Sequence, residues 1–272
     1  MKKHLKIGKK LLDLSTPKIM GIVNTTPDSF YENSRTNTLD AILLKTEKHL
    51  NEGADFIDIG GYSTRPGASE ISLEEEIKRI VEPIKQIKTN FPNCIISCDT
   101  FRSQVAQIAI DNGADLINDI SGGELDTDMF NVISKNKVPY ILMHSKGNPQ
   151  TMQDQTEYKS IFKEMVNYFS SKIEYLHELG LTEIIIDPGF GFAKTMEQNY
   201  ELLNNLQDFY FLKHPILVGV SRKSMIYKKL NTTPEEALNG TTILNTIALS
   251  KGAKILRVHD VKEAKEIVTL LF

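Results

Sequence analysis

The chain has 272 residues, of which 40% are hydrophobic and 25% charged, and its formal net charge is −3. This composition predicts a globular protein with a large core and argues against a dedicated nucleic-acid-binding protein. No apolar run is long enough to span a membrane, and no signal-peptide core follows the lysine-rich start. We interpret residues 1–17 as a solvated N-terminal extension.

The two cysteines indicate the redox setting. Cys94 and Cys98 lie four positions apart in a strand-like run, which separates them by roughly 13 Å. That distance is too large for a disulfide. Their spacing does not suit a metal site either, so we predict a reducing, cytoplasmic environment.

Apolar strand-like runs and helical patterns alternate along the rest of the chain. The expected strands are residues 18–23, 55–59, 94–98, 115–118, 139–143, 184–187, 215–220 and 254–258. The expected helices are residues 38–53 (capped by Thr38), 72–90, 102–112, 128–135, 158–179, 197–207, 234–250 and 261–271. Strict alternation over about 250 residues favours a single closed (β/α)8 barrel of the TIM-barrel type, covering residues 18–272.

The segment Ile184–Lys194 (IIIDPGFGFAK) illustrates how a strand of this barrel ends. Three consecutive isoleucines indicate a strand that is covered on both faces, and Pro188 ends it directly after Asp187. The Asp187 carboxylate therefore lies at the carboxyl end of a buried strand, where it requires partners. Those partners are either loop amides or a ligand with paired N–H donors.

Polar residues follow the other expected strands in the same way. The set is Asn24, Asp99, Asn118, His144, Asp187, Lys223, Arg257 and His259. Any one of them alone is more often structural, but in a barrel these strand ends converge on one mouth, where the active sites of this fold lie. The acidic and amide side chains can accept N–H bonds from a flat heterocycle. The cationic side chains, and a helix start expected at Ser224, suit an anion such as a phosphate.

Several segments at these strand ends resemble the dihydropteroate synthase family of pterin-binding enzymes, in the family's order and over nearly the whole chain. They are MGIVNTTPDSF (Met20–Phe30), GYSTRPGA (Gly61–Ala68), SCDT (Ser97–Thr100), INDISGG (Ile117–Gly123), MHSKGNPQTMQ (Met143–Gln153), DPGFGFAK (Asp187–Lys194), GVSRKSMI (Gly219–Ile226) and RVHDV (Arg257–Val261).

The resemblance implies a transferase of folate biosynthesis, a class of enzyme that sulfonamides target. It would condense (7,8-dihydropterin-6-yl)methyl diphosphate with 4-aminobenzoate to give 7,8-dihydropteroate and diphosphate. A dissociative displacement is reasonable, because the pterin ring can spread positive charge and diphosphate leaves readily once its charge is neutralised. The resemblance also implies Mg²⁺ as cofactor and a homodimer, with no nucleic-acid or membrane partner.

The resemblance further implies roles for individual residues. The implied pterin-binding residues are Asp99, Asn118, Met143, Asp187, Phe192, Gly219, Lys223 and Arg257. The implied diphosphate-binding residues are Asn24, Thr64, Arg65, Arg257 and His259, with Asn24 also the ligand of Mg²⁺. The implied 4-aminobenzoate-binding residues are Thr64, Arg65, Pro66, Phe190, Lys223 and Ser224. The expected catalytic residues are Asp99, Asp187, Lys223, Arg257 and Asp28, and no strong general base is expected.

Two departures and three alternatives accompany this hypothesis. Tyr62 stands where the family usually has Glu, and Tyr31–Ser34 replaces the usual Ser-Asp-Gly-Gly. A methyltetrahydrofolate-binding methyltransferase would share the pterin-edge residues but not the TPDSF, STRPG and SRKS loops. A non-catalytic pterin-binding homologue is expected to lack Asn24, Lys223 or Arg257. A Schiff-base role for Lys223 is disfavoured, because Arg222 and Ser224 beside it are interpreted as anion binders.

Overall fold

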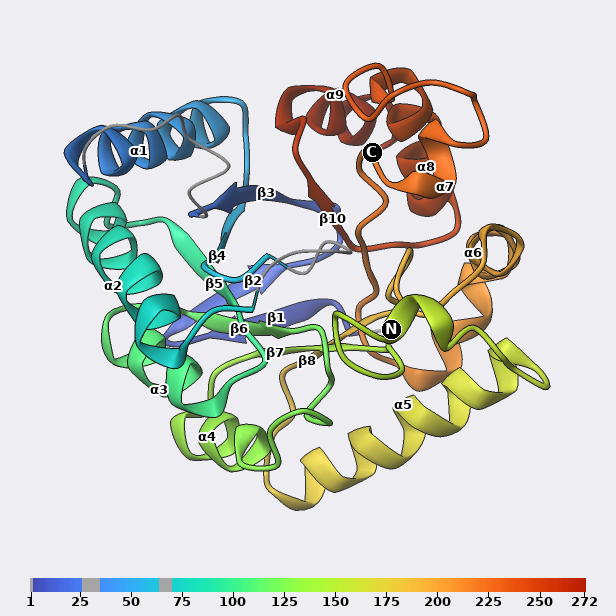
Figure 1. The fold of residues 1–272 in the computed structure, drawn as a ribbon, viewed down its shortest axis with the longest axis horizontal. Coiled ribbons are helices and arrows are strands. Elements are labelled where there is room, and N and C mark those ends of the chain that lie inside the picture. The colour runs from blue at the N-terminus through green and yellow to red at the C-terminus, as the bar shows by residue number, and fades with distance from the viewer. Residues whose placement is uncertain (1, 26–34, 64–69) are drawn as a thin grey trace.

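The structure, a computed structural model, describes residues 2–25, 35–63 and 70–272. Eight parallel strands form a nearly closed barrel with helices around its outside (Figure 1), which confirms the predicted (β/α)8 fold. The strands are β3 (Lys18–Asn24), β4 (Phe56–Gly60), β5 (Ile95–Asp99), β6 (Leu116–Asp119), β7 (Tyr140–Met143), β8 (Ile184–Asp187), β9 (Leu217–Val218) and β10 (Ile255–Val258). Their order is β8-β7-β6-β5-β4-β3-β10-β9, and one bridge between Ile186 and Ile216 joins β8 to the segment before β9.

The helices connect successive strands. They are α1 (Arg35–Asn51), α2 (Leu73–Asn90), α3 (Ser103–Asp111), α4 (Met129–Asn136), α5 (Ile161–Glu178), α6 (Met196–Asn204), α7 (Ser224–Tyr227), α8 (Leu238–Ser250) and α9 (Val261–Leu271), with 3₁₀ helices η2 (Met152–Asp154) and η3 (Leu206–Leu212). The prediction that Thr38 caps the first helix is wrong, because α1 already begins at Arg35. Two helices, α7 and α8, lie between β9 and β10, and α7 begins at Ser224, where a helix start was expected.

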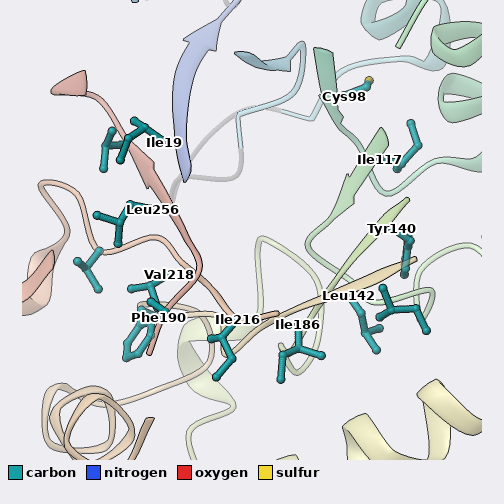
Figure 2. Packing of buried hydrophobic residues seen from close by; sticks show 14 of the residues in the cluster. Ile19, Cys98, Ile117, Tyr140, Leu142, Ile186, Phe190, Ile216, Val218 and Leu256 are labelled. Carbon is teal, nitrogen blue, oxygen red and sulfur yellow. The ribbon is translucent and has the colours of Figure 1, made fainter. Parts of the chain in front are cut away.

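Side chains alternate along each barrel strand, as the two-residue period of a strand requires. One set points outward and packs beneath the helices; Ile19, Ile117, Leu142, Ile186 and Leu256 are among its members, and Figure 2 shows several of them together. The other set points into the barrel. At the start of the strands this inner set is apolar and consists of Met20, Phe56, Leu116, Ile141, Ile185, Leu217 and Ile255.

The N-terminal residues close the end of the barrel at which the strands start, so the prediction of a solvated extension over residues 1–17 is wrong. Strands β1 (His4–Ile7) and β2 (Lys10–Asp13) form an antiparallel hairpin. Its side chains Leu5 and Ile7, together with Leu14, are buried against the inner apolar set. The lysines that suggested an extension are largely exposed on the outer side of this hairpin. Burial of each aliphatic side chain contributes roughly 1.5–3 kcal/mol.

Two smaller predictions also have an outcome. Cys94 and Cys98 are both buried and free, as their spacing predicted. No helix in the described part of the chain is long and apolar enough to cross a membrane.

Candidate active site at the mouth of the barrel

The inner set of side chains turns polar toward the carboxyl ends of the strands. Asp58 follows Phe56 by two residues in β4, and Asn118 follows Leu116 in the same way in β6. The same two-residue step leads to Asp187 in β8, Gly219 just after β9 and Arg257 in β10. Strand geometry therefore places a layer of mostly polar residues next to the apolar inner set, at the end of the barrel where the strands end.

Arg257 is the centre of this polar layer. Its Nε donates to Asp58 Oδ2 at 2.6 Å, and one terminal nitrogen donates to Asp99 Oδ2 at 2.8 Å. The Asn118 amide donates to the same Asp58 oxygen at 3.3 Å. Three residues predicted for the pterin site thus form one connected network, and the fourth member, Asp58, was not predicted.

Asp58 could have been found from the sequence. It lies within the strand-like run DFIDI, where both neighbours, Ile57 and Ile59, are apolar and fully buried. A charged side chain in such a run has to face the barrel interior and find a partner there.

The charges of the network shift one another. Burial raises the pKa of Asp99 to about 7; the nearby Arg257 opposes this shift, and the like charge of Asp58 reinforces it. Burial disfavours the charged form of Arg257, but the carboxylates of Asp58 and Asp99 outweigh it and raise the pKa of Arg257. Arg257 is therefore a permanent cation between the carboxyl groups of Asp58 and Asp99, both of which interact with it.

Asp187 and Lys223 form the neighbouring part of the site. One Asp187 oxygen accepts the Gly189 N–H at 2.7 Å, so the loop-amide interpretation is correct for that oxygen. The Lys223 ammonium donates to the Phe190 carbonyl and lies 4.5 Å from the centre of the Phe192 ring. Burial lowers the pKa of Lys223 to about 8, and Asp187 opposes this shift. Burial raises the pKa of Asp187, and Lys223 opposes that shift in turn.

Lys194 and His144 tie the loops after β7 and β8 together. The buried Lys194 ammonium donates to the carbonyls of His144 (3.2 Å), Gly189 (3.1 Å) and Phe192 (2.9 Å), and lies 3.1 Å from His144 Nδ1. Burial lowers the pKa of His144 to about 2, so this residue at the mouth is a neutral framework group. A Cβ atom at Gly189 would lie 2.1 Å from the His144 carbonyl oxygen, so only glycine fits at this crossing of the two loops.

Two residues assigned to the site from the sequence lie in surroundings that were not predicted. The Phe190 ring is fully buried in the core beside Ile216 and Val218 (Figure 2), and its contact with 4-aminobenzoate stays a prediction. Only its carbonyl reaches the site, through Lys223. Arg222 is not available as an anion binder, because its guanidinium forms two hydrogen bonds of 2.9 Å with the Asp260 carboxylate.

The remaining predicted residues fall into two groups. Asn24, Ser224 and His259 are half-buried at the ends of β3, β9 and β10, and Met143 is buried at the end of β7. The helix that begins at Ser224, α7, has 4 residues. The predicted residues Asp28, Thr64, Arg65 and Pro66, and the departure at Tyr31–Ser34, lie outside the described residues.

Tyr62, the departure that lies within the described residues, makes three contacts with other described residues. Its ring packs edge-on against Phe101 at 5.1 Å and lies under the Arg102 guanidinium at 5.4 Å. Its hydroxyl accepts a hydrogen bond of 3.2 Å from Gln150. Tyr62 therefore joins the segments that follow β4, β5 and β7.

The chemistry of Asn24 suits Mg²⁺ that arrives with a phosphate ligand. In the described residues no three His, Cys, Asp or Glu side chains come together to hold a metal ion. Mg²⁺, however, typically takes only one or two protein oxygens and completes its shell with substrate phosphates and water. The amide oxygen of Asn24, at the end of β3, can supply one such ligand.

A mouth that combines acceptors for ring N–H groups with cations for an anion defines a barrel enzyme that binds a flat, polar heterocycle. The family model described as pterin binding enzyme matches residues 20–259. A dihydropteroate synthase of Synechocystis is 43% identical over 97% of this chain and 92% of its own.

Solved structures show the same likeness. A Yersinia pestis dihydropteroate synthase with a sulfonamide drug complex has a TM-score of 0.92 and 39% identity, covering 98% of this chain and 97% of its own. A Xanthomonas albilineans dihydropteroate synthase with 4-aminobenzoic acid has a TM-score of 0.92 and 33% identity, covering 99% and 97%. The chain belongs to the pterin-binding enzymes and, among them, to the dihydropteroate synthase family, whose members are transferases of folate biosynthesis.

Proposed function

We propose that this chain condenses (7,8-dihydropterin-6-yl)methyl diphosphate with 4-aminobenzoate at the mouth of the barrel. The observation that carries the proposal is the single cluster in which Arg257 bridges Asp58 and Asp99 beside Asp187 and Lys223. The edge of the pterin donates hydrogen bonds to the carboxylates of Asp99 and Asp187. The Asn118 amide both donates to this edge and accepts from it. Lys223, Met143, Phe192 and Gly219 line the same ring.

The diphosphate lies on the cationic side of the mouth. Arg257 contributes a fixed charge there, and His259 and Asn24 flank it from the ends of β10 and β3. Asn24 would hold Mg²⁺ on the protein side, and the ion would neutralise charge on the diphosphate. The buried carboxylate of Asp99 faces the electron-rich ring and stabilises positive charge that develops on it, which favours a dissociative displacement.

The second substrate lies beside Lys223. Its carboxylate is directed toward Lys223 and Ser224, and the exposed part of the Phe192 ring provides the apolar surface first expected of Phe190. Thr64, Arg65, Pro66 and Asp28 stay in the proposal on the family resemblance alone. No general base of shifted pKa is required, because an arylamine that attacks a pterin cation loses its proton to solvent.

A homodimer is part of the proposal. It rests on the family resemblance. Large apolar side chains available to a second copy are exposed on α8 and at the C-terminal end of α9: Ile243 is 51% exposed, Leu270 85% and Phe272 60%. Sedimentation of the purified chain as a monomer at micromolar concentration would contradict the dimer. The cytoplasmic setting stays a prediction from cysteine usage.

One assay tests the reaction. The purified protein is incubated with the pterin diphosphate, 4-aminobenzoate and Mg²⁺, and both diphosphate and 7,8-dihydropteroate are measured. Formation of both in equal amounts is expected. Pterin binding without turnover would favour a non-catalytic pterin-binding homologue, and activity with a methyl-bearing folate in place of these substrates would favour a methyltransferase.

The metal assignment has its own test. Diphosphate is titrated by calorimetry into the wild type and Asn24→Ala, each with and without Mg²⁺. Mg²⁺ should strengthen diphosphate binding in the wild type and much less in the variant. An equal strengthening in both proteins would show that Asn24 is not the protein ligand.

A further inference from the structure

The Asp58 carboxylate is buried in the middle of a strand and holds two pterin-site residues at once. The carboxylate is 1% exposed, and its Oδ2 accepts from both Arg257 Nε (2.6 Å) and the Asn118 amide (3.3 Å). Arg257 comes from β10 and Asn118 from β6, on opposite sides of β4 in the order of strands. One oxygen therefore fixes the relative position of two side chains whose strands are not neighbours in the sheet.

The other oxygen of Asp58 is unusual for a buried carboxylate. Within the described part of the chain, Oδ1 has no hydrogen-bond partner, and the Ser97 hydroxyl at the paired position of β5 has none either. An unsatisfied buried acceptor costs stability. Asp58 is therefore poorly explained as a stabilising residue.

Glu76 shows what a stabilising buried carboxylate looks like in the same protein. It is fully buried between the barrel and the helices, and it also pairs with one arginine, Arg102, at 2.9 Å. Both of its oxygens have partners, because the second accepts from the Thr100 hydroxyl at 2.7 Å. The pair of Glu76 and Arg102 provides a matched control for the pair of Asp58 and Arg257.

We propose that Asp58 is a positioning residue of the pterin site, which orients the Arg257 guanidinium and the Asn118 amide for the flat ring. The inference rests on the proposed function, since it concerns the same substrate. The held Nε leaves the remaining guanidinium nitrogens directed at Asp99 and the mouth. Without Asp58, Arg257 can rotate toward Asp99 alone, and the Asn118 amide loses its acceptor.

Asp58 also affects the charge of Asp99. Among the described residues, Arg257 and Lys223 favour the ionised form of Asp99, and the like charges of Asp58, Glu76 and Asp119 disfavour it. Removing the negative charge of Asp58 lowers the pKa of Asp99. If ionised Asp99 binds the pterin, the acidic limb of pterin affinity shifts to lower pH in an Asp58 variant, and by more than in a Glu76 variant, because Asp58 acts on Asp99 more strongly than Glu76 does.

The test compares wild type, Asp58→Asn and Glu76→Gln. Binding of 6-hydroxymethylpterin is measured by calorimetry between pH 5 and 9, with thermal unfolding of each protein as a check on folding. Loss of a charge-assisted pair in the site should weaken pterin binding at least about tenfold in Asp58→Asn. Its KM for the pterin diphosphate should rise while its KM for 4-aminobenzoate stays within about twofold of wild type. Glu76→Gln should lose thermal stability but keep the pterin affinity of the wild type.

The outcomes separate the two proposals. Failure of the wild type to bind the pterin would overturn the proposed function itself. Pterin binding by Asp58→Asn equal to wild type, with an unshifted acidic limb, would overturn the role of Asp58 alone. Equal weakening in Asp58→Asn and Glu76→Gln would also overturn it, because the loss would then be one of general stability. Should Asp58→Asn fail to fold, Asp58→Ser provides a smaller neutral side chain for the same measurements.

Discussion

The two ends of this barrel are built from the same strands but follow different rules. At the end where the strands start, the inner side chains are apolar and the β1–β2 hairpin covers them. Two residues further along β4, β6, β8 and β10, the inner side chains are charged or amide-bearing. Among them, Asp58, Asn118 and Arg257 form one hydrogen-bonded network. Stability and ligand recognition are thus carried by different positions of one strand, and substitutions at the two ends should have separable effects.

The largest effect is expected at the floor. Leu5→Ala removes a fully buried side chain of the hairpin and should lower the free energy of unfolding by about 2–5 kcal/mol. Leu11→Ala is the control, since Leu11 belongs to the same hairpin but is 65% exposed. Chemical denaturation measures both, and pterin affinity of the folded protein should not change. Weaker pterin binding in Leu5→Ala would show that the two ends are coupled.

The converse substitution is at the mouth. Asp187→Asn replaces an acceptor by a donor that faces ring N–H groups, and loss of such a bond costs on the order of 2–5 kcal/mol. Pterin affinity should therefore fall thirtyfold or more, by about 2 kcal/mol at least. Asp55→Asn is the control at the opposite end of the barrel, where the Asp55 carboxylate accepts from the Ile19 N–H at 2.9 Å. Unchanged calorimetric binding in Asp187→Asn would mean that this carboxylate is structural.

Acid should destabilise the folded protein through one buried histidine at each end of the barrel. Burial lowers the pKa of His144, at the mouth, from 6.5 to about 2, and that of His214, before β9, to about 4. Each contributes stability above pH 6.5 that is lost as the pH falls, because the unfolded chain binds the proton first. When the pH is lowered from 7 to 5, each histidine should reduce the free energy of unfolding by roughly 2 kcal/mol.

The two contributions differ in where the loss stops. The loss due to His214 should level off near pH 4, whereas that due to His144 continues toward pH 2. Urea unfolding of His144→Gln and His214→Gln at several pH values measures these slopes. A His144→Gln protein with the pH dependence of the wild type would show that folding does not lower the pKa of His144.

The smallest effect is expected beside the mouth. Tyr62→Phe removes the hydroxyl that accepts from Gln150 and keeps the ring contact with Phe101. One net hydrogen bond contributes about 1 kcal/mol, so thermal unfolding should shift only slightly. A loss above about 3 kcal/mol would indicate that the hydroxyl anchors more than this one contact.

The fold was predictable because its signals are local. Apolar runs such as IIID at β8 mark strands within a few residues, and glycine-terminated helices separate them. The hairpin was missed because its exposed lysines obscured the two-residue alternation of Leu5 and Ile7. In the site, the strand-end polar residues were identified, but Asp58 was not, because it lies in the middle of β4 and not at its end. Its partners Asn118 and Arg257 lie 60 and 199 positions away.

The burial of the Phe190 ring was not predictable for a different reason. In the loop GFGF the two rings alternate about glycines of positive φ, Gly189 at 69° and Gly191 at 81°. No period of the sequence indicates which ring such a loop directs into the core. The structure buries Phe190 and leaves Phe192 partly open beside Lys223.

The short β9 leaves the barrel weakly closed between β8 and β9. β9 has 2 residues, and a single bridge between Ile186 and Ile216 joins its segment to β8. Under load or heat the ring should part along this line, which has Asp187 on one side and Lys223 on the other. A pterin that contacts both groups, as proposed, would connect the two sides of this line. Binding of the pterin would then stabilise the closed barrel. Amide hydrogen exchange at Ile216 and Leu217, measured with and without the pterin, would report this stabilisation.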